Sequence, residues 1–161
     1  MNSITIREAT LTDLDVLTLL FDAYRQFYGY DSDSKAARAF LNERLERSES
    51  VVFIAFEGDE AVGFTQLYPG FSSLSLGRNF LLNDLFVLPD CRKKGVGAGL
   101  IHAAIDHARA VGANGLSLST ARSNKTAQSL YEALGWQRDD HFLYYDFVVD
   151  DRHDDGEEDV R

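Results

Sequence analysis

The chain has 161 residues, 45% of them hydrophobic, which is enough for one well-buried core. Its formal net charge of −10 disfavours nonspecific binding to DNA or RNA; it would attract a cationic ligand, or it simply keeps the protein soluble. No apolar stretch approaches the ~20 residues that span a bilayer. The single cysteine, Cys91, excludes an internal disulfide and a multi-cysteine zinc site. We therefore expect a soluble, cytoplasmic protein without nucleic-acid, membrane or metal partners.

The first half of the chain has patterns typical of strands and amphipathic helices. Thr10-Leu-Thr-Asp13 is a helix N-cap, and apolar residues then recur every three or four positions until Gly29. The turn 57–60 separates two apolar runs and predicts a hairpin, which a loop at 69–77 follows. The expected elements are, in order, a strand at 4–8, helices at 10–28 and 34–47, and strands at 51–56 and 61–68.

The second half adds three strands and two helices to this prediction. A long strand at 80–88 stops at Pro89, and the helix after the glycine-rich loop ends near Gly112. The remaining expected elements are a strand at 115–120, a helix at 125–134 and a last strand at 142–149. This order predicts an α/β protein of the α+β type, with a mixed, mostly antiparallel sheet of six to seven strands flanked by about four helices. We expect residues 1–149 to form one domain and residues 150–161, with seven acidic residues and two arginines, to be a flexible tail.

The run Arg92-Lys-Lys-Gly-Val-Gly-Ala-Gly99 connects the long strand to an apolar helix. Unblocked backbone N–H groups, flanking cations and a helix N-terminus together fit a diphosphate. The run lacks the Gly-Lys pair of a nucleotide-triphosphate P-loop, and it departs from the dinucleotide fingerprint because Leu100 stands where the last glycine should be. It therefore indicates a phosphate-bearing cofactor; the alternative is a tight turn with close helix packing.

Two motifs carry a family resemblance. The first is Arg/Gln-x-x-Gly-x-Gly/Ala after a strand, satisfied by Arg92, Gly95 and Gly97. The second is Ser123-Asn-x-x-Ala-x-x-Leu-Tyr-x-x-x-Gly-Trp136, at the right distance along the chain. Over residues 4–149 the sequence resembles the GNAT superfamily of acyl-coenzyme A N-acyltransferases. The strand Asn83-Asp-Leu-Phe-Val87 resembles the branch that includes polyamine and thialysine acetyltransferases, where Glu-Asp often occupies the first two positions.

The resemblance implies acetyl-CoA as co-substrate and names the residues that bind it. Backbone amides of the loop would hold the pyrophosphate, with Arg92 or the lysines adding charge, and backbone of the preceding strand would bind the pantetheine arm. Asn124 would lie close to that arm, or serve only as a helix cap. The implied cofactor-binding residues are Leu85, Phe86, Val87, Arg92, Lys93, Lys94, Gly95, Val96, Gly97, Ala98, Asn124, Ala127 and Tyr131.

The catalytic residues that we expect are Tyr131, Asp84 and Asn83. The resemblance places the Tyr131 phenol at the sulfur, as the acid that protonates the thiolate; the alternative is a core tyrosine. Asn83 stands where the branch has glutamate and cannot take up a proton. Asp84 is either the base or a structural carboxylate, and a water held by Asn83 is a third option. Strand alternation points Asn83 and Asp84 to opposite faces unless a bulge re-aims them.

The acceptor pocket is expected at the end of the first helix, with the loop after it, and at residues 68–73. Aromatic rings and an acid there could receive an amine through cation–π and ionic contacts, or could form core or a dimer interface. The expected substrate-binding residues are Tyr28, Tyr30, Asp31, Tyr68, Phe71 and Asn83. We expect His102 to be a surface residue and His107 a packing residue.

The predicted activity is acetyl transfer from acetyl-CoA directly to a primary amine, a small cationic one by preference, by an acyltransferase in which Cys91 is not a nucleophile. Two alternatives remain open: a non-catalytic acyl-CoA-binding or sensing module, which the loss of glutamate at Asn83 favours, and a protein lysine or N-terminal acetyltransferase. Since the family often dimerises, the resemblance also allows a homodimer.

Overall fold

The computed structural model describes residues 3–150. The expected acidic tail, 150–161, lies outside the described residues except for Asp150. The chain divides after Leu118 into two compact units, which are described here one at a time. In the described part of the chain, no helix is long and apolar enough to cross a membrane.

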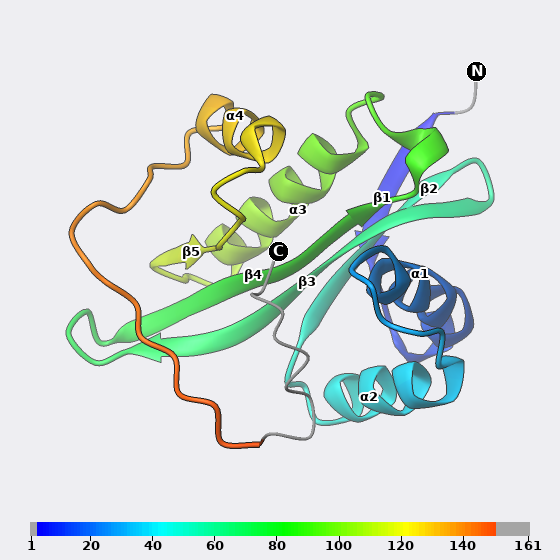
Figure 1. The fold of residues 1–161 in the computed structure, drawn as a ribbon, viewed down its shortest axis with the longest axis horizontal. Helices are drawn as coiled ribbons and strands as arrows, with labels where there is room; N and C mark the ends of the chain where they lie inside the picture. Colours follow the sequence, from blue (N-terminus) through cyan, green and yellow to red (C-terminus); the bar gives the residue numbers. More distant parts are fainter. Residues whose placement is uncertain (1–2, 151–161) are drawn as a thin grey trace. The chain divides into compact units, whose positions relative to one another are not determined.

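The first unit is built on a five-stranded sheet (Figure 1). The strands lie in sequence order; β1 to β4 are antiparallel to their neighbours, and β5 runs parallel to β4. Beyond Leu67, β3 pairs only with β4, and these two strands continue as a long hairpin. The strands are β1 (Ile4–Glu8), β2 (Val51–Glu57), β3 (Glu60–Ser72), β4 (Gly77–Val87) and β5 (Gly115–Ser117).

Helices cover both faces of this sheet and bury two separate clusters of apolar side chains. α1 (Leu14–Phe27) and α2 (Ser34–Glu46) pack on one face, where Leu17, Leu41 and Phe64 are fully buried. α3 (Val96–Ala110) packs on the other face through Val96 and Leu100. The sheet is therefore the middle layer of the first unit, and side chains on the two faces of β4 contact different helices.

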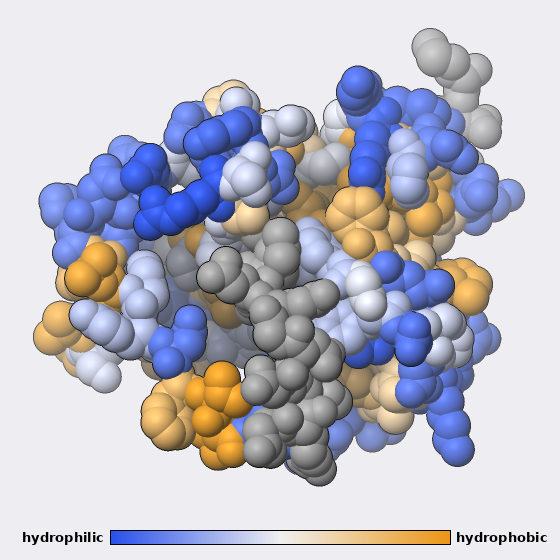
Figure 2. Space-filling view, in the orientation of Figure 1, coloured by the Kyte–Doolittle hydropathy of each residue, from blue (hydrophilic) through white to orange (hydrophobic). Residues whose placement is uncertain are grey.

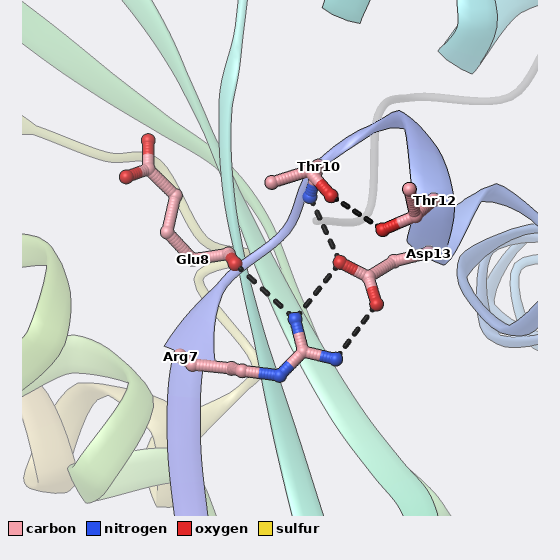
Figure 3. Close-up of polar contacts among 5 residues, drawn as sticks. All are labelled: Arg7, Glu8, Thr10, Thr12 and Asp13. Atoms are coloured by element: carbon pink, nitrogen blue, oxygen red, sulfur yellow. Dashed lines mark hydrogen bonds and ion pairs between the residues drawn. The ribbon is translucent and has the colours of Figure 1, made fainter.

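An ion pair joins β1 to the start of α1 (Figure 3). The Arg7 guanidinium donates to both carboxylate oxygens of Asp13, with Nη1–Oδ2 and Nη2–Oδ1 distances of 2.9 and 2.7 Å. Asp13 ends the short 3-10 helix η1 (Leu11–Asp13), and its Oδ2 also accepts from the Thr10 N–H at 2.8 Å. The hydrogen bond from Arg7 holds the pKa of Asp13 below its usual range. The N-cap expected at Thr10 is thus present and reinforced from the neighbouring strand.

The hairpin of β3 and β4 is longer than the sequence predicts. The loop expected at 69–77 is mostly strand, because Pro69 to Ser72 pair with Phe80 to Gly77 and only 73–76 form the turn. Proline is a poor strand residue because it lacks an N–H, yet here it lies beyond the end of β2, where β3 has one paired neighbour. The proline therefore does not end the strand as expected.

The second unit contains α4 (Lys125–Ala133), and the predicted strand at 142–149 is wrong. Residues 142–149 have no regular secondary structure, and their side chains are exposed, from 71% for Val148 to 91% for Val149. Figure 2 shows hydrophobic side chains gathered over this segment at the lower edge of the view. Strand propensity is realised only where a neighbouring strand and a buried face are supplied, and this segment has neither within its unit. The described residues therefore form five strands, not six to seven.

Candidate active site

β4 and β5 separate shortly after they begin to pair. The parallel ladder covers Asn79 to Leu81 on β4 and Gly115 to Ser117 on β5, and within the described residues it ends there. Among the described strands, the stretch of β4 from Leu82 to Val87 therefore pairs with β3 alone. Peptide groups along such an edge are available to the amides of an extended ligand, as the resemblance implies for Leu85, Phe86 and Val87.

A β-bulge at Asn83 changes the direction of the β4 side chains. Gln66 lies opposite Asp84, but Leu67 lies opposite Leu82, so Asn83 is one extra residue on the β4 side of the ladder. Before the bulge, the Phe80 ring lies 5.5 Å from the His107 ring of α3; after it, the Phe86 ring lies 5.8 Å from the Tyr24 ring of α1. Even-numbered residues thus change face, which is what a single extra residue does to a strand.

The bulge brings Asn83 and Asp84 together. The Asn83 Nδ2 donates to Asp84 Oδ1 at 3.1 Å, and Gln66 Nε2 on β3 donates to Oδ2 at 2.9 Å. The Thr65 hydroxyl donates to the backbone carbonyl of Asp84 at 2.8 Å. Asp84 is 4% exposed, and Gln66 and Thr65 are fully buried. We call these four residues, Thr65, Gln66, Asn83 and Asp84, the bulge cluster.

The sequence analysis identified Asn83 and Asp84 but missed Gln66 and Thr65. Their signal was present: two polar residues interrupt the apolar strand Val62-Gly-Phe-Thr-Gln-Leu67, and polar side chains are rarely buried without a partner. Their connection to Asp84, eighteen residues away in sequence, depends on the register of the hairpin, which the sequence did not give.

The glycine-rich loop joins the end of β4 to α3 by a short 3-10 turn, η2 (Pro89–Cys91). Residues 92–95 are exposed, and Lys93 and Gly95 have left-handed backbones, with φ of 64° and 82°. Gly95 is the N-cap of α3 and provides no side chain to cap it. Because the first N–H groups of a helix lack partners within the helix, Val96, Gly97 and Ala98 can offer theirs to an anion.

The tight turn and the close helix packing expected of these glycines lie at different positions of the run. A Cβ on Gly95 would meet nothing within 4 Å, so its glycine serves the left-handed turn and leaves open space. A Cβ on Gly99 would lie 2.7 Å from Ile6 Cδ1, so that glycine serves close packing of α3 on β1.

Two cations of the loop, Arg92 and Lys94, already have protein partners. Arg92 Nε donates to the Val87 carbonyl at 3.0 Å, and the guanidinium lies 4.9 Å from the Phe27 ring centre and 5.9 Å from that of Phe86. Lys94 Nζ lies 3.5 Å from Glu57 Oε2. Arg92 therefore joins the end of α1 to the end of β4, and a contact to phosphate would require its side chain to move.

The end of α1 supplies an aromatic wall beside β4. Tyr24 is buried and contacts Phe64, Phe86 and Tyr28. Tyr28 is half-buried, with its ring 5.1 Å from that of Tyr24 and 5.2 Å from that of Phe27. Tyr24 is thus core, and Tyr28 lies at the half-buried margin of that core.

The other residues expected in the acceptor pocket are more scattered. Tyr30 is 44% exposed and stacks with Arg25, and Asp31 is exposed. Tyr68 lies two positions along β3 from Gln66. Phe71, five positions from Gln66 or about 16 Å along the strand, is 78% exposed and contacts Arg78 near the hairpin turn. The structure does not bring Phe71 to the bulge cluster.

A buried carboxylate orders the segment between α1 and α2. Asp22 accepts from the Ser32 hydroxyl at 2.6 Å and from the Asp33 N–H at 2.9 Å. These hydrogen bonds, the one from Ser32 foremost, hold the pKa of Asp22 below its usual range. The segment that carries Tyr30 and Asp31 is therefore anchored at its far end.

In the second unit, the Asn124 motif is a capped helix. Asn124 Oδ1 accepts from the Ala127 N–H at 3.1 Å, as expected of an N-cap. Tyr131 is half-buried, with its ring 6.0 Å from that of Trp136. Gly135, with φ of 95°, ends the helix as predicted.

The two histidines of α3 lie as predicted. His102 is exposed, and His107 is half-buried between the rings of Phe53 and Phe80, at 5.7 and 5.5 Å. Both histidines are thus accounted for without a catalytic role.

Comparison with known proteins agrees with this geometry. The acetyltransferase (GNAT) family matches residues 17–136. An uncharacterized N-acetyltransferase, YhfO of Bacillus subtilis, is 49% identical over 87% of this chain and 94% of its own. A thialysine N-epsilon-acetyltransferase of Bos taurus is 36% identical over 50% of this chain and 47% of its own. A crystal structure of a probable acetyltransferase has 42% identity and a TM-score of 0.87, covering 91% of this chain and 99% of the other. The chain therefore belongs to the acetyltransferase (GNAT) family, and it is an acyltransferase of that kind.

Proposed function

We propose that this protein transfers the acetyl group of acetyl-CoA directly to a primary amine, with a small cationic amine as the preferred acceptor. The observation that carries the proposal is the unpaired edge of β4, which runs from the buried carboxylate of Asp84 to the glycine-rich loop at the start of α3. A thioester carrier bound along this edge would have its diphosphate at the loop and its reacting end near the bulge cluster.

The loop binds the coenzyme chiefly through backbone. The N–H groups of Lys93 to Ala98 hold the pyrophosphate, and peptide groups of Leu85 to Val87 bind the pantetheine arm. The open space beside Gly95 allows close approach of a ligand. Arg92 and the two lysines contribute charge once Arg92 leaves the Val87 carbonyl.

The acceptor must lose a proton before it can attack the thioester. A lysine-like amine has a pKa of ~10.4, so its neutral form costs roughly 4.6 kcal/mol at pH 7. Asp84 accepts that proton, either directly or through a water held by Asn83. The amine nitrogen forms a bond to the acetyl carbon, the carbon–sulfur bond breaks, and Tyr131, the expected acid of the second motif, protonates the departing thiolate. The second proton that the nitrogen loses on becoming an amide then restores the phenol.

The acceptor is proposed to be cationic because the wall beside β4 is aromatic and the chain is acidic. Tyr28 presents a half-buried ring, and aromatic faces attract ammonium groups. The net charge of −10 raises the local concentration of cations. Thialysine, named for one relative, is a compound of this class.

A thiol-release assay tests the proposal. Acetyl-CoA is offered with a panel of primary amines: lysine, thialysine, a diamine, a polyamine and a basic peptide. We expect turnover with a small amine, unaffected by His102→Ala on the exposed face of α3. Preference for the peptide would instead indicate a protein acetyltransferase, and a trapped acetyl group on Cys91 would contradict direct transfer.

One observation favours a second function, an acyl-CoA sensor without catalysis. Asp84 is 4% exposed and Asn83 cannot act as a base, so the cluster could be purely structural. Calorimetry separates the two functions, since heat from acetyl-CoA binding without turnover of any amine would support the sensor. Sedimentation of the same samples measures whether the protein is a homodimer, as the resemblance allows.

A further inference from the structure

We propose that Gln66 is a positioning residue for the reaction: its amide holds the Asp84 carboxylate in a fixed orientation. This inference rests on the proposed function, because it gives Asp84 the part of the base. Neither the family motifs nor the sequence patterns singled out Gln66.

The contact between the two side chains is built into the sheet. Gln66 and Asp84 are directly opposite in the ladder, on the face that α1 covers, and Gln66 Nε2 lies 2.9 Å from Asp84 Oδ2. Gln66 is 0% exposed and Asp84 4%. A hydrogen bond to an ionised carboxylate in such a place is stronger than one between neutral groups, and water cannot easily replace it.

The chemistry of the pair fixes which way the amide points. An ionised carboxylate only accepts hydrogen bonds, so the NH2 of Gln66 faces Asp84 and its carbonyl oxygen faces away. Asn83 does the same at the other carboxylate oxygen, through Nδ2 at 3.1 Å. Two amide donors, one on each oxygen, oppose rotation of the carboxylate.

The contact with Asp84 leaves the carbonyl oxygen of Gln66 unsatisfied within the described part of the chain. Among the residues that the structure describes, nothing donates to Gln66 Oε1, although the atom is buried. An unsatisfied buried oxygen is unfavourable, and an apolar residue of similar size would avoid it. The stability of the strand pair therefore does not explain a glutamine here, whereas support of a reactive carboxylate does.

The test separates the positioning of Asp84 from support of the fold. Gln66→Met keeps an unbranched side chain of similar length but removes the donor. We expect kcat for the amine to fall about tenfold, with the KM for acetyl-CoA unchanged, because the carboxylate is no longer held in place. Gln66→Glu keeps the shape but replaces the donor by a second carboxylate, and we expect a larger fall in kcat.

Thr18→Val is the matched control. It removes another buried side-chain hydrogen bond of the same unit, from the Thr18 hydroxyl to the Leu14 carbonyl, and leaves the carboxylate of Asp84 untouched. We expect its kcat to equal that of the wild type even where its thermal stability falls. A kcat that does not fall in Gln66→Met overturns the inference, as does a fall that Thr18→Val shares or that comes with a loss of acetyl-CoA binding. A wild type that binds acetyl-CoA but turns over no amine overturns the proposed function itself, which is a different result.

Discussion

The glycine-rich loop and the bulge cluster are the two parts of the proposed site, and they are built in opposite ways. The loop is exposed, short and local: its shape comes from two left-handed backbones within four residues, at Lys93 and Gly95. The bulge cluster is buried, and it joins side chains that lie eighteen positions apart. A site made of backbone should fail through added bulk, while a site made of paired side chains should fail through lost hydrogen bonds.

The largest effect is expected from bulk and charge in the loop. Gly97→Glu places a carboxylate in the first turn of α3, where the proposed diphosphate binds, so like charges repel and the space is filled. We expect acetyl-CoA affinity to fall at least about 100-fold, measured by calorimetry. Gly115→Ala is the control, because a Cβ there would meet nothing within 4 Å and φ is ordinary. Unchanged affinity in Gly97→Glu would remove the loop from the site.

The next effect is expected from the bulge cluster and should spare the coenzyme. Asp84→Asn keeps the size of the side chain but removes the proposed base, and we expect kcat to fall by about 100-fold or more, with the KM for acetyl-CoA unchanged. A parallel loss of acetyl-CoA binding would show that the two parts are not separate. Thermal unfolding measures whether the amide merely destabilises the hairpin.

A smaller effect is expected where the two parts meet. Arg92→Lys keeps the charge but loses the Nε hydrogen bond to Val87 and most of the contact with Phe27. We expect the KM for acetyl-CoA to rise by about three- to tenfold, with kcat little changed. The control is Lys125→Met, which removes an exposed cation on α4. A fall in kcat without a change in KM would assign Arg92 to the chemistry instead.

The same contrast explains what the sequence could predict. The loop, the caps of α1 and α4 and the end of α4 at Gly135 follow from local rules, and the structure has them as expected. The sequence predicts that side chains alternate between the faces of β4 unless a bulge interrupts the strand. The structure has a bulge at Asn83, and it brings Asn83 and Asp84 together.

What the sequence could not predict depends on partners far along the chain. Residues 142–149 have a strand pattern but no strand, since propensity does not supply a neighbour. The contact between Gln66 and Asp84 requires the exact pairing of β3 with β4, and no local signal fixes that register. Phe71 was expected in a loop at 69–77, but it is paired with Arg78 within the hairpin.

The smallest effect is expected from Arg7 and Asp13, which are paired side chains like those of the bulge cluster but lie only six positions apart in sequence. Asp13→Asn loses the charge on a carboxylate that accepts from Arg7 and Thr10, and we expect the free energy of unfolding in urea to fall by about 1–2 kcal/mol. Asp15→Asn is the control: its carboxylate pairs with Arg38 but is 85% exposed, so we expect less than about 0.5 kcal/mol.

The difference in the free energy of unfolding between the wild type and Asp13→Asn should depend on pH. The pKa of Asp13 is lowered in the folded state, so the unfolded chain binds the proton more readily and the contribution is fully present above the unfolded value of about 3.9. As pH falls through the folded pKa, the contribution disappears, and the wild type and Asp13→Asn should converge in acid. Curves that stay apart at pH 2 would mean that the hydrogen bonds, and not the charge, carry the stabilisation, and the local pair would then resemble the bulge cluster.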